Sequence, residues 1–337
     1  MRRTRIIAAL AALAALTLAG CGAPGSSGGG GSAAPSGSAS GSSTLATCKP
    51  VAGDQLVVLE DDKNLQTVDN IIPAVNAAAA QPAMIAALDA VSATLDTPAL
   101  IALNKKVDIE RSTSSQAAQQ YYKDAGITVS EKGSGKVVVG AGNFSESATL
   151  AELYALALRD AGYDAEVRTI GNRETYEPAL ESGEITVVPE YAGTLTEFLN
   201  KKVNGPDATD KNPQASADLD STVKNLHTLG EKVGLTFGAP SKAADENAFA
   251  VTTAFAKEHD VKTLSDLAGA CGGLVLGGPP ECPDRPFCEP GLKQTYGLDI
   301  TQFVSLDAGG PLTKQALTSG QVTFGLVFSS DAALAQG

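Results

Sequence analysis

Lys136-Val-Val-Val-Gly-Ala-Gly-Asn-Phe-Ser-Glu146 is the stretch that decides the fold of this sequence. Its three consecutive valines are β-branched and predict a buried strand, and residues 145–161 carry apolar side chains at helical spacing. Further strands are expected at 166–170 and 185–188, with a short helix at 176–182 between them. This β-α-β-α-β order predicts a mainly parallel sheet, which binds ligands at the carboxyl ends of its strands.

A second series with the same alternation follows between residues 248 and 330. Strands are expected at 249–251, 274–276, 303–305 and 322–328, and helices at 264–267, 291–296 and 312–318. Ahead of both series, residues 56–63 and 71–75 are strand-like and helical stretches continue to Tyr122. The two series predict an α/β protein of two lobes with a ligand cleft between them.

The amino-terminal residues predict export and anchoring. Three arginines precede an apolar run at 6–18 that is too short to cross a bilayer, so residues 1–20 are interpreted as a signal peptide. Leu18-Ala-Gly-Cys21 is typical of a bacterial lipobox, which would make Cys21 the lipidated residue; the alternative is an ordinary signal with a chance cysteine. Gly, Ser, Ala, Pro and Thr dominate residues 22–47, so a flexible tether is expected over 21–53. We expect a protein anchored by lipid to the cell membrane and facing the extracytoplasmic side.

Charge and cysteine usage narrow the possible partners. A formal net charge of −13 argues against nucleic acid. Besides Cys21 there are four cysteines: Cys48, Cys271, Cys282 and Cys288. An even set in an exported chain predicts disulfides. A metal site is the alternative, but the spacing contains no Cys-x-x-Cys pair, and His227 and His259 lie far from the cysteines in sequence. We therefore expect neither metal nor cofactor.

Enzyme motifs are weak or missing. Gly140-Ala-Gly-Asn-Phe-Ser145 begins like a dinucleotide-binding fingerprint but lacks the third glycine. After the tether there is no Gly-x-Ser-x-Gly elbow and no Walker lysine, and neither histidine stands in a motif that would make it a base. The sequence therefore predicts a binding protein and not an enzyme.

Several motifs together carry a family resemblance. They are Gly140-Ala-Gly-Asn-Phe-Ser-Glu146, Gly183-Glu-Ile-Thr-Val-Val-Pro-Glu-Tyr-Ala-Gly-Thr194, Thr263-Leu-Ser-Asp-Leu267, residues 285–298 and Gln315-Ala-Leu-Thr-Ser-Gly-Gln-Val322. The chain after the tether resembles substrate-binding proteins of quaternary-amine ABC importers, which take up glycine betaine, choline and carnitine.

The resemblance implies a two-lobed, type II periplasmic-binding-protein-like fold. It also implies a monomer that delivers a small quaternary-amine osmolyte to the permease subunits of an ABC transporter. The alternatives are a lobe pair that senses a ligand for a receptor, and an importer component for a different small polar solute such as an amino-acid derivative.

The segment order departs from that family. Residues 56–63, 71–75 and the helical stretches to Tyr122 resemble its carboxyl-terminal segment but come first here. We interpret this as a circular permutation with Lys132-Gly-Ser-Gly135 as the join between the old ends. Residues 54–130 are then a hinge strand plus part of lobe 1, residues 136–240 the rest of lobe 1, and residues 241–337 lobe 2. Hinges are expected near 54–61 and 240–247.

The resemblance also implies an aromatic box for the cation. A quaternary ammonium cannot donate hydrogen bonds from nitrogen, and aromatic rings attract it through cation–π interactions. The family pattern puts Tyr191 in this box, and Phe249 and Phe328 stand where members commonly have tyrosines. Both phenylalanines lie in strand-like runs, so a core position is the alternative for each.

Polar contacts are implied as well. Arg285 and Thr194 match family positions that hold a ligand carboxylate, a task that suits a guanidinium. Asn143 and Asn247 complete the expected set of ligand-binding residues. Gly142 replaces a lysine, and Lys314 a box tyrosine, that members often carry, which leaves the identity of the ligand open.

The permuted order suggests how the cysteines pair. Cys282 and Cys288 flank the loop that contains Arg285, so a local bond between them is the simplest pairing. In the permuted arrangement the start of the Leu56 strand lies near the strand that follows Cys271, which would allow a bond between Cys48 and Cys271. Four cysteines allow three pairings, so the other two stay open at this point.

Overall fold

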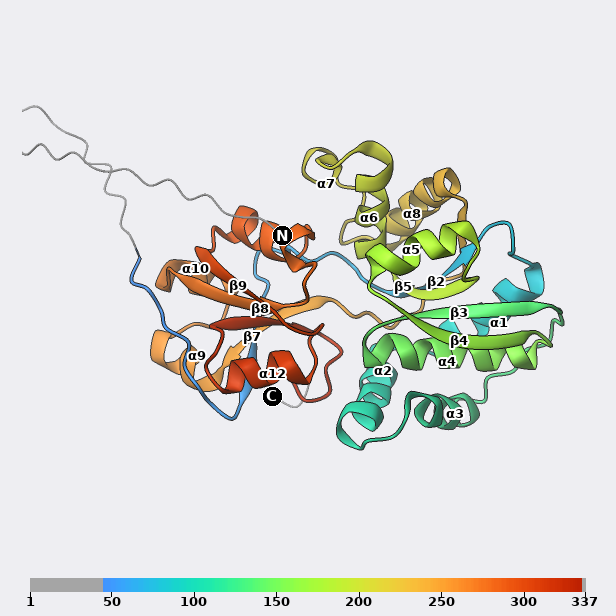
Figure 1. The fold of residues 1–337 in the computed structure, drawn as a ribbon, viewed down its shortest axis with the longest axis horizontal. Coiled ribbons are helices and arrows are strands. Elements are labelled where there is room, and N and C mark those ends of the chain that lie inside the picture. Colours follow the sequence, from blue (N-terminus) through green and yellow to red (C-terminus); the bar gives the residue numbers. More distant parts are fainter. Residues whose placement is uncertain (1–44, 335–337) are drawn as a thin grey trace, which may run out of the picture. The chain divides into compact units, whose positions relative to one another are not determined.

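The computed structural model describes residues 45–334, which form two five-stranded sheets with helices around each (Figure 1). The signal peptide expected at 1–20 and the lipobox residue Cys21 lie outside the described residues. Residues 45–53, expected to belong to the tether, include packed chain. Cys48 is buried, and its N–H donates to the Gly272 carbonyl at 3.1 Å. The folded part therefore begins before residue 54.

Lobe 1 contains the sheet of order β4-β3-β5-β2-β6. Its strands are β2 (Ile71–Asn76), β3 (Lys136–Gly142), β4 (Asp164–Gly171), β5 (Val187–Tyr191) and β6 (Leu235–Phe237). Its helices are α1 (Pro82–Ser92), α2 (Thr97–Asn104), α3 (Ser114–Asp124), α4 (Ser145–Asp160), α5 (Arg173–Ser182), α6 (Ala192–Asn204), α7 (Ala208–Lys211) and α8 (Leu219–Val233), and a π-helical turn (Lys105–Ile109) follows α2. Strand β3 is parallel to β4 and β5, whereas β2 is antiparallel to β5 and β6.

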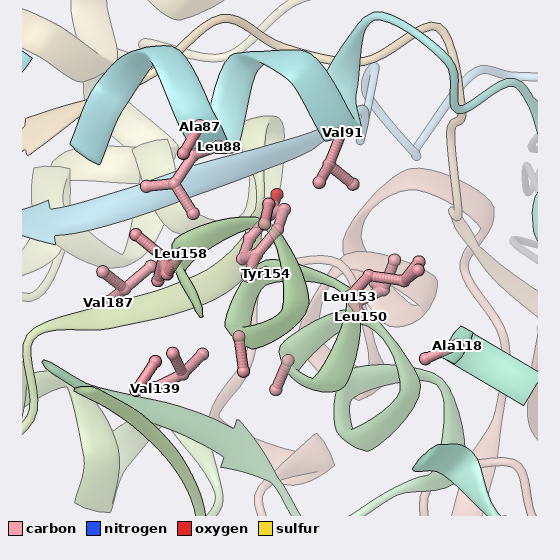
Figure 2. Close-up of a cluster of buried hydrophobic side chains, with 14 of the residues drawn as sticks. Ala87, Leu88, Val91, Ala118, Val139, Leu150, Leu153, Tyr154, Leu158 and Val187 are labelled. Carbon is pink, nitrogen blue, oxygen red and sulfur yellow. The ribbon is translucent and has the colours of Figure 1, made fainter. Parts of the chain in front are cut away.

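The three valines of β3 explain how lobe 1 is layered. Val137 and Val139 are buried in a cluster that includes residues of α1 and α4, while Val138 packs against the cluster formed with α5, α6 and α8. Alternate residues of a strand point to opposite faces, so a continuous apolar strand requires helices on both sides. Figure 2 shows the first cluster, in which Tyr154 of α4 lies below Leu88 of α1. The predicted strand at 185–188 begins two residues later, at Val187, because the Ile185 N–H bonds to the Ala179 carbonyl at 3.2 Å in the turn after α5.

Lobe 2 contains the sheet of order β1-β7-β10-β8-β9. Its strands are β1 (Leu56–Leu59), β7 (Asn247–Thr252), β8 (Leu274–Gly278), β9 (Ile300–Ser305) and β10 (Phe324–Phe328). Its helices are α9 (Thr253–His259), α10 (Leu264–Ala270), α11 (Glu289–Gly291) and α12 (Pro311–Thr318), with a 3₁₀ turn (Cys282–Asp284) and a π-helical turn (Leu292–Tyr296). Strand β8 is parallel to β9 and β10, and β7 is antiparallel to β10 and β1. Within residues 45–334 no helix combines the length and the apolar character needed to span a membrane.

The two sheets share one topology. In lobe 1, β3 lies between β4 and β5, and the antiparallel β2 lies beside β5. In lobe 2, β8 lies between β9 and β10, and the antiparallel β7 lies beside β10. Both antiparallel strands arrive from the other lobe. Strand β2 follows β1 of lobe 2 and β7 follows β6 of lobe 1, so the chain crosses at residues 60–70 and 238–246. This is the two-lobed, type II periplasmic-binding-protein-like arrangement of an α/β chain.

One expected hinge lies elsewhere. The strand expected at 56–60 was to start in lobe 2 and run between the lobes, but residues 56–59 all pair with β7, from Leu56 opposite Thr252 to Leu59 opposite Phe249. Backbone hydrogen bonds therefore hold it in the lobe 2 sheet, and the crossing follows it at 60–70. The second crossing, at 238–246, coincides with the hinge expected at 240–247.

The two expected disulfides are present. Cys48 bonds to Cys271 with a Cα–Cα distance of 5.2 Å, and Cys282 bonds to Cys288 with a Cα–Cα distance of 5.3 Å. The first ties the amino-terminal segment to lobe 2 just before β8. Although distant in sequence, His259 places its Nδ1 3.5 Å from Cys48 Sγ, beside a sulfur pair that is already joined.

Candidate ligand-binding site

A cavity of about 570 Å³ is lined by residues of both lobes. This volume falls in the range of small-molecule sites, about 300–1,000 Å³. All predicted site residues except Phe249 line it: Asn143, Tyr191, Thr194, Asn247, Arg285 and Phe328. The first three come from lobe 1 and the last three from lobe 2, so the structure brings the two halves of the predicted site together.

Phe249 belongs to the core of lobe 2. Its side chain is 1% exposed, and its ring centroid is 6.1 Å from that of Phe324. Phe249 shares one face of β7 with Asn247, which lines the cavity, but it lies two residues, or about 7 Å, further along the strand. The core position that the sequence left open for Phe249 is the one observed.

Three aromatic rings lie side by side along the cavity, and we call this group the cage. The Phe144 ring centroid is 6.3 Å from that of Tyr191 and 5.9 Å from that of Phe328. Tyr191 and Phe328 end β5 and β10, and Phe144 comes two residues after β3. All three therefore lie at the carboxyl ends of parallel strands, where open α/β sheets bind ligands.

Phe144 was missing from the predicted site, although it stands in the quoted stretch directly after the predicted strand. Gly142 gives its ring the room it occupies, because a Cβ atom at this position would come within 2.8 Å of Phe144 Cε1. Lys314, which stands at the other departure from the family, forms an ion pair with Asp331 and does not line the cavity.

A buried carboxylate holds one residue of the cage by a hydrogen bond. Glu146, in the first turn of α4, accepts a hydrogen bond from Tyr191 Oη at 2.6 Å and others from Ser330 Oγ at 2.7 Å and Asn104 Nδ2 at 2.6 Å. Ser330 follows β10 of lobe 2, and its N–H donates to Asp245 Oδ1 at 2.9 Å. Burial, together with the charge of Glu146, raises the pKa of Tyr191 well above its usual value, so this hydroxyl stays protonated and donates.

Asp69 caps the helix that follows Tyr191. Its carboxylate accepts from the backbone N–H groups of Gly193 at 2.9 Å and Thr194 at 3.0 Å, at the amino end of α6. Burial raises the pKa of Asp69 to about 7, against the opposing effect of the Thr194 hydrogen bonds. Position 193 has to be glycine, because a Cβ atom there would overlap Thr67 and the Val68 carbonyl.

The cationic side chains around the cavity are largely engaged by carboxylates. Arg173 is buried and forms a two-pronged pair with Glu190, at 2.9 and 2.7 Å, and also donates to Thr194 Oγ1 at 2.9 Å. Lys202 lies 2.7 Å from oxygens of both Glu177 and Glu181.

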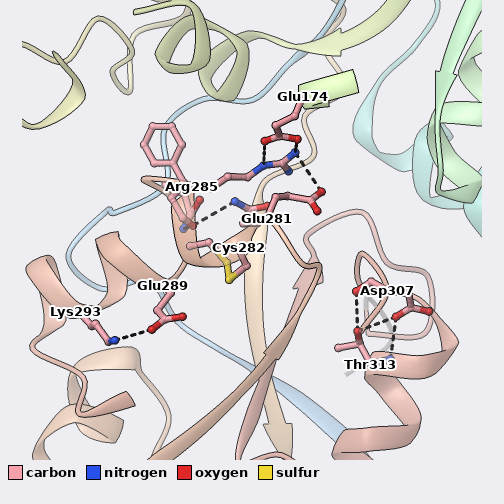
Figure 3. The surroundings of a disulfide bond; sticks show 12 residues. Glu174, Glu281, Cys282, Arg285, Glu289, Lys293, Asp307 and Thr313 are labelled. Carbon is pink, nitrogen blue, oxygen red and sulfur yellow. Dashed lines mark hydrogen bonds and ion pairs between the residues drawn. A yellow bond between two sulfur atoms is a disulfide. The ribbon is translucent and has the colours of Figure 1, made fainter. Parts of the chain in front are cut away.

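Arg285 bridges the two lobes. Its Nε and Nη2 atoms bond to the two carboxylate oxygens of Glu174 of α5, at 3.1 and 2.9 Å, and Nη2 lies 3.2 Å from Glu281 Oε1 (Figure 3). The bond between Cys282 and Cys288 closes the loop that presents this arginine. Lys201 adds a second bridge, from its Nζ to the Asp284 carbonyl at 3.0 Å. The guanidinium expected to hold a ligand carboxylate is therefore already occupied by two side-chain carboxylates.

Comparison with known proteins identifies the family of this chain. The chain matches the family described as the substrate-binding domain of ABC-type glycine betaine transport systems over residues 46–124 and 135–336. A glycine-betaine-binding protein of Pseudomonas aeruginosa is 28% identical over 182 residues, 51% of this chain and 55% of that protein. The chain thus spans about half the length of this curated relative.

Similar solved structures are more distant. One described as a glycine betaine/carnitine/choline ABC transporter is 22% identical with a TM-score of 0.36, covering 59% of this chain and 71% of that one. NikA from Brucella suis in complex with Fe(III)-EDTA is 14% identical with a TM-score of 0.29, covering 59% and 48%. The family match extends over most of the sequence. The chain therefore belongs to the substrate-binding domains of ABC-type glycine betaine transport systems, which are solute-binding transport components and not enzymes.

Proposed function

We propose that this protein captures a small quaternary ammonium compound of the glycine betaine, choline and carnitine class outside the cytoplasm and delivers it to the permease subunits of an ABC importer. The observation that carries the proposal is the cage of Phe144, Tyr191 and Phe328, built from both lobes. A methylated ammonium has no N–H to donate, and each well-placed ring contributes about 0.5–2 kcal/mol of attraction. The cations that line the cavity are bound by carboxylates or a carbonyl, so they oppose a cationic head group less than free cations would.

Lobe closure is the proposed binding motion. Phe328 and Phe144 belong to different lobes, so a ligand that packs against the exposed sides of these rings contacts both lobes. The chain connects the lobes at residues 60–70 and 238–246, the arrangement of a hinged pair. We propose that the ligand stabilises the closed arrangement in which Arg285 reaches Glu174, and that the permease recognises this form of a monomer.

We propose further that the chain is circularly permuted relative to its family. Supporting this, the family match falls in two stretches separated by residues 125–134, a gap that contains the first three residues of Lys132-Gly-Ser-Gly135. Leu334 and Leu56 also pack against the same hydrophobic cluster, so residues near the two ends of the described chain are neighbours. A variant that starts at Gly135, with residues 334 and 45 joined by a linker long enough to reach between them, should bind the same ligand with unchanged affinity. A variant that folds but has lost binding would contradict the permutation.

Lipid anchoring through Cys21 is proposed from the lipobox. Radiolabelled palmitate should be incorporated by cells that express the full chain and not by cells that express Cys21→Ala. Equal labelling of both chains, or labelling of neither, would contradict an anchor at this residue.

A thermal-shift panel tests the proposed function. Glycine betaine, choline, carnitine, proline betaine and ergothioneine are added separately to the chain without its signal peptide. A ligand that binds the folded state alone stabilises it by mass action, by about 2.7 kcal/mol at a hundred times its Kd. At least one quaternary ammonium compound should raise the Tm. No shift with any of the five would contradict the proposed ligand class. Permease and ATPase genes beside this one would distinguish an importer component from a sensor.

A further inference from the structure

Glu146 joins a ring of the cage to the opposite lobe. One of its oxygens accepts from Tyr191 Oη at 2.6 Å, and the other accepts from Ser330 Oγ at 2.7 Å and Asn104 Nδ2 at 2.6 Å. The three donors come from β5, from the segment after β10 and from α2. All four side chains are buried, so the network is shielded from water. A single carboxylate thus fixes Tyr191 and also links lobe 2 to the ligand cage.

The charge of Glu146 has no cationic partner among residues 45–334. No Lys, Arg or His of this part of the chain forms an ion pair with Glu146 or with Asp245, which is also buried. Glu146 lies in the amino-terminal turn of α4, where the helix dipole favours a negative charge. A buried charge without a counter-charge is costly, and an incoming cation reduces that cost.

The other titratable groups near this network are mostly acidic. Tyr191 and Asp245 face Glu146, and Asp69 lies next to Asp245. Arg173 faces Asp69, but Glu190 holds its guanidinium in a two-pronged pair. Burial, and then the charge of Glu146, raise the pKa of Asp245 well above its usual value. A bound cation would oppose this effect, so binding of a cation and loss of the Asp245 proton favour each other.

The hydrogen bond to Glu146 also changes the Tyr191 ring. A phenol that donates to a carboxylate gains electron density on its ring, and cation–π attraction depends on that density. Phe144 and Phe328 carry no hydroxyl, so this effect is available only at Tyr191 within the cage. A cation over the Tyr191 ring would lie close to the Glu146 charge in surroundings that screen it weakly.

We propose that Glu146 is the positioning residue of the ligand site: it orients Tyr191, ties Ser330 of lobe 2 to the cage, and supplies the negative charge that selects a cationic head group. This rests on the proposed function, since it concerns how that same site distinguishes a cation from an uncharged molecule of equal shape. Glu146 acts through Tyr191, because it does not line the cavity.

Calorimetry with matched ligands tests the proposal. Choline and glycine betaine are each compared with the carbon isostere in which a quaternary carbon replaces the nitrogen, the weaker ligands being measured by competition. In Glu146→Gln the affinity for the two ammonium compounds should fall at least about tenfold more than the affinity for the isosteres. Wild-type affinity for the ammonium compounds should rise with pH, with release of protons, and Glu146→Gln should show a flatter profile and a smaller release.

Three variants separate charge from structure. Glu197→Gln is the matched control, because Glu197 is a buried carboxylate of α6 that accepts from the Ala215 N–H at 2.6 Å and does not line the cavity. It should leave the ratio of ammonium to isostere affinity unchanged. Ser330→Ala removes the link to lobe 2 and should weaken both ligand types equally. Tyr191→Phe keeps the ring without the hydrogen bond and should weaken only the ammonium compounds, which keeps the proposal testable if Glu146→Gln fails to fold.

The possible failures are distinguishable. If the wild type binds neither ammonium compound, both the proposed function and the proposed role of Glu146 are contradicted. If the wild type binds but Glu146→Gln loses both ligand types equally, or keeps its affinity and its pH profile, only the role of Glu146 is overturned.

Discussion

The Arg285 guanidinium forms a two-pronged ion pair with Glu174 across the lobes, with N–O distances of 3.1 and 2.9 Å. We expect Arg285→Ala to weaken binding of glycine betaine and of choline by the same factor, because the bridge favours the closed arrangement whatever the ligand carries. The pair is partly exposed, at 31% and 40%, so the effect should be small, at most about fivefold for a pair worth up to about 1 kcal/mol. Calorimetry with both ligands checks this. A loss confined to glycine betaine would show instead that Arg285 holds the ligand carboxylate.

Tyr191 is expected to be the most sensitive position of the cage. Tyr191→Ala removes both the ring and the hydrogen bond to Glu146, and should weaken ligand binding by about 2–3 kcal/mol, or roughly 30- to 150-fold. Phe249→Leu is the matched control, because Phe249 lies in the core of lobe 2. It should cost about 1 kcal/mol of unfolding free energy with affinity unchanged. Denaturant titration measures the unfolding free energy, and calorimetry measures the affinity. A large loss of affinity in Phe249→Leu would show that this residue belongs to the ligand site.

Asp69 should make stability depend on pH. Burial raises its folded-state pKa to about 7, above the unfolded value of about 3.9, so the folded state holds this proton more tightly. The contribution to stability is fully present below pH 4 and is lost as the pH rises through 7, by about 1.4 kcal/mol per pH unit between these values. In Asp69→Asn the unfolding free energy should therefore fall less steeply from pH 5 to pH 7 than in the wild type. Urea titrations at both pH values decide it, and parallel profiles would mean that Asp69 does not titrate in this range.

The two disulfides should differ in what they stabilise. The Cys48–Cys271 bond joins residues 223 apart in sequence, and chain entropy predicts a loss of about 5 kcal/mol in unfolding free energy when both are replaced by serine. The Cys282–Cys288 bond spans 6 positions and should contribute about 2 kcal/mol, but its loss frees the loop of Arg285 and should lower ligand affinity. Denaturant unfolding and calorimetry on the two double variants compare these effects. A greater loss of stability from the short loop would contradict the chain-entropy reasoning.

The spacing of apolar residues predicted most of the helices and strands, because this spacing reflects which side chains of each element are buried. The continuous apolar run of β3 required cover on both faces of the sheet, and Gly183 closes α5 in the left-handed conformation that a helix end often takes. The partner of a strand is not a local property. A strand starting at Leu56 in lobe 2 was correctly expected, but its full-length pairing with β7 depends on residues about 190 positions away, so the hinge expected within it was misplaced.

The site was predicted in part for the same reason. Tyr191 stood out because it ends a strand before a loop, and Phe144 carried the same signal. Phe249 and Phe328 lie in similar apolar runs, and only depth along the strand separates a core ring from a cage ring. The bond from Arg285 to Glu174 joins residues 111 apart in sequence, a distance at which spacing carries no information about contact.

Calorimetric titration of the chain, without its signal peptide, with glycine betaine, choline and carnitine tests the central proposal most directly. We expect saturable one-to-one binding of at least one of the three to the wild type, and a loss of at least about thirtyfold in Tyr191→Ala. No heat of binding with any of the three, or binding that Tyr191→Ala leaves unchanged, would contradict a quaternary ammonium site in this cavity.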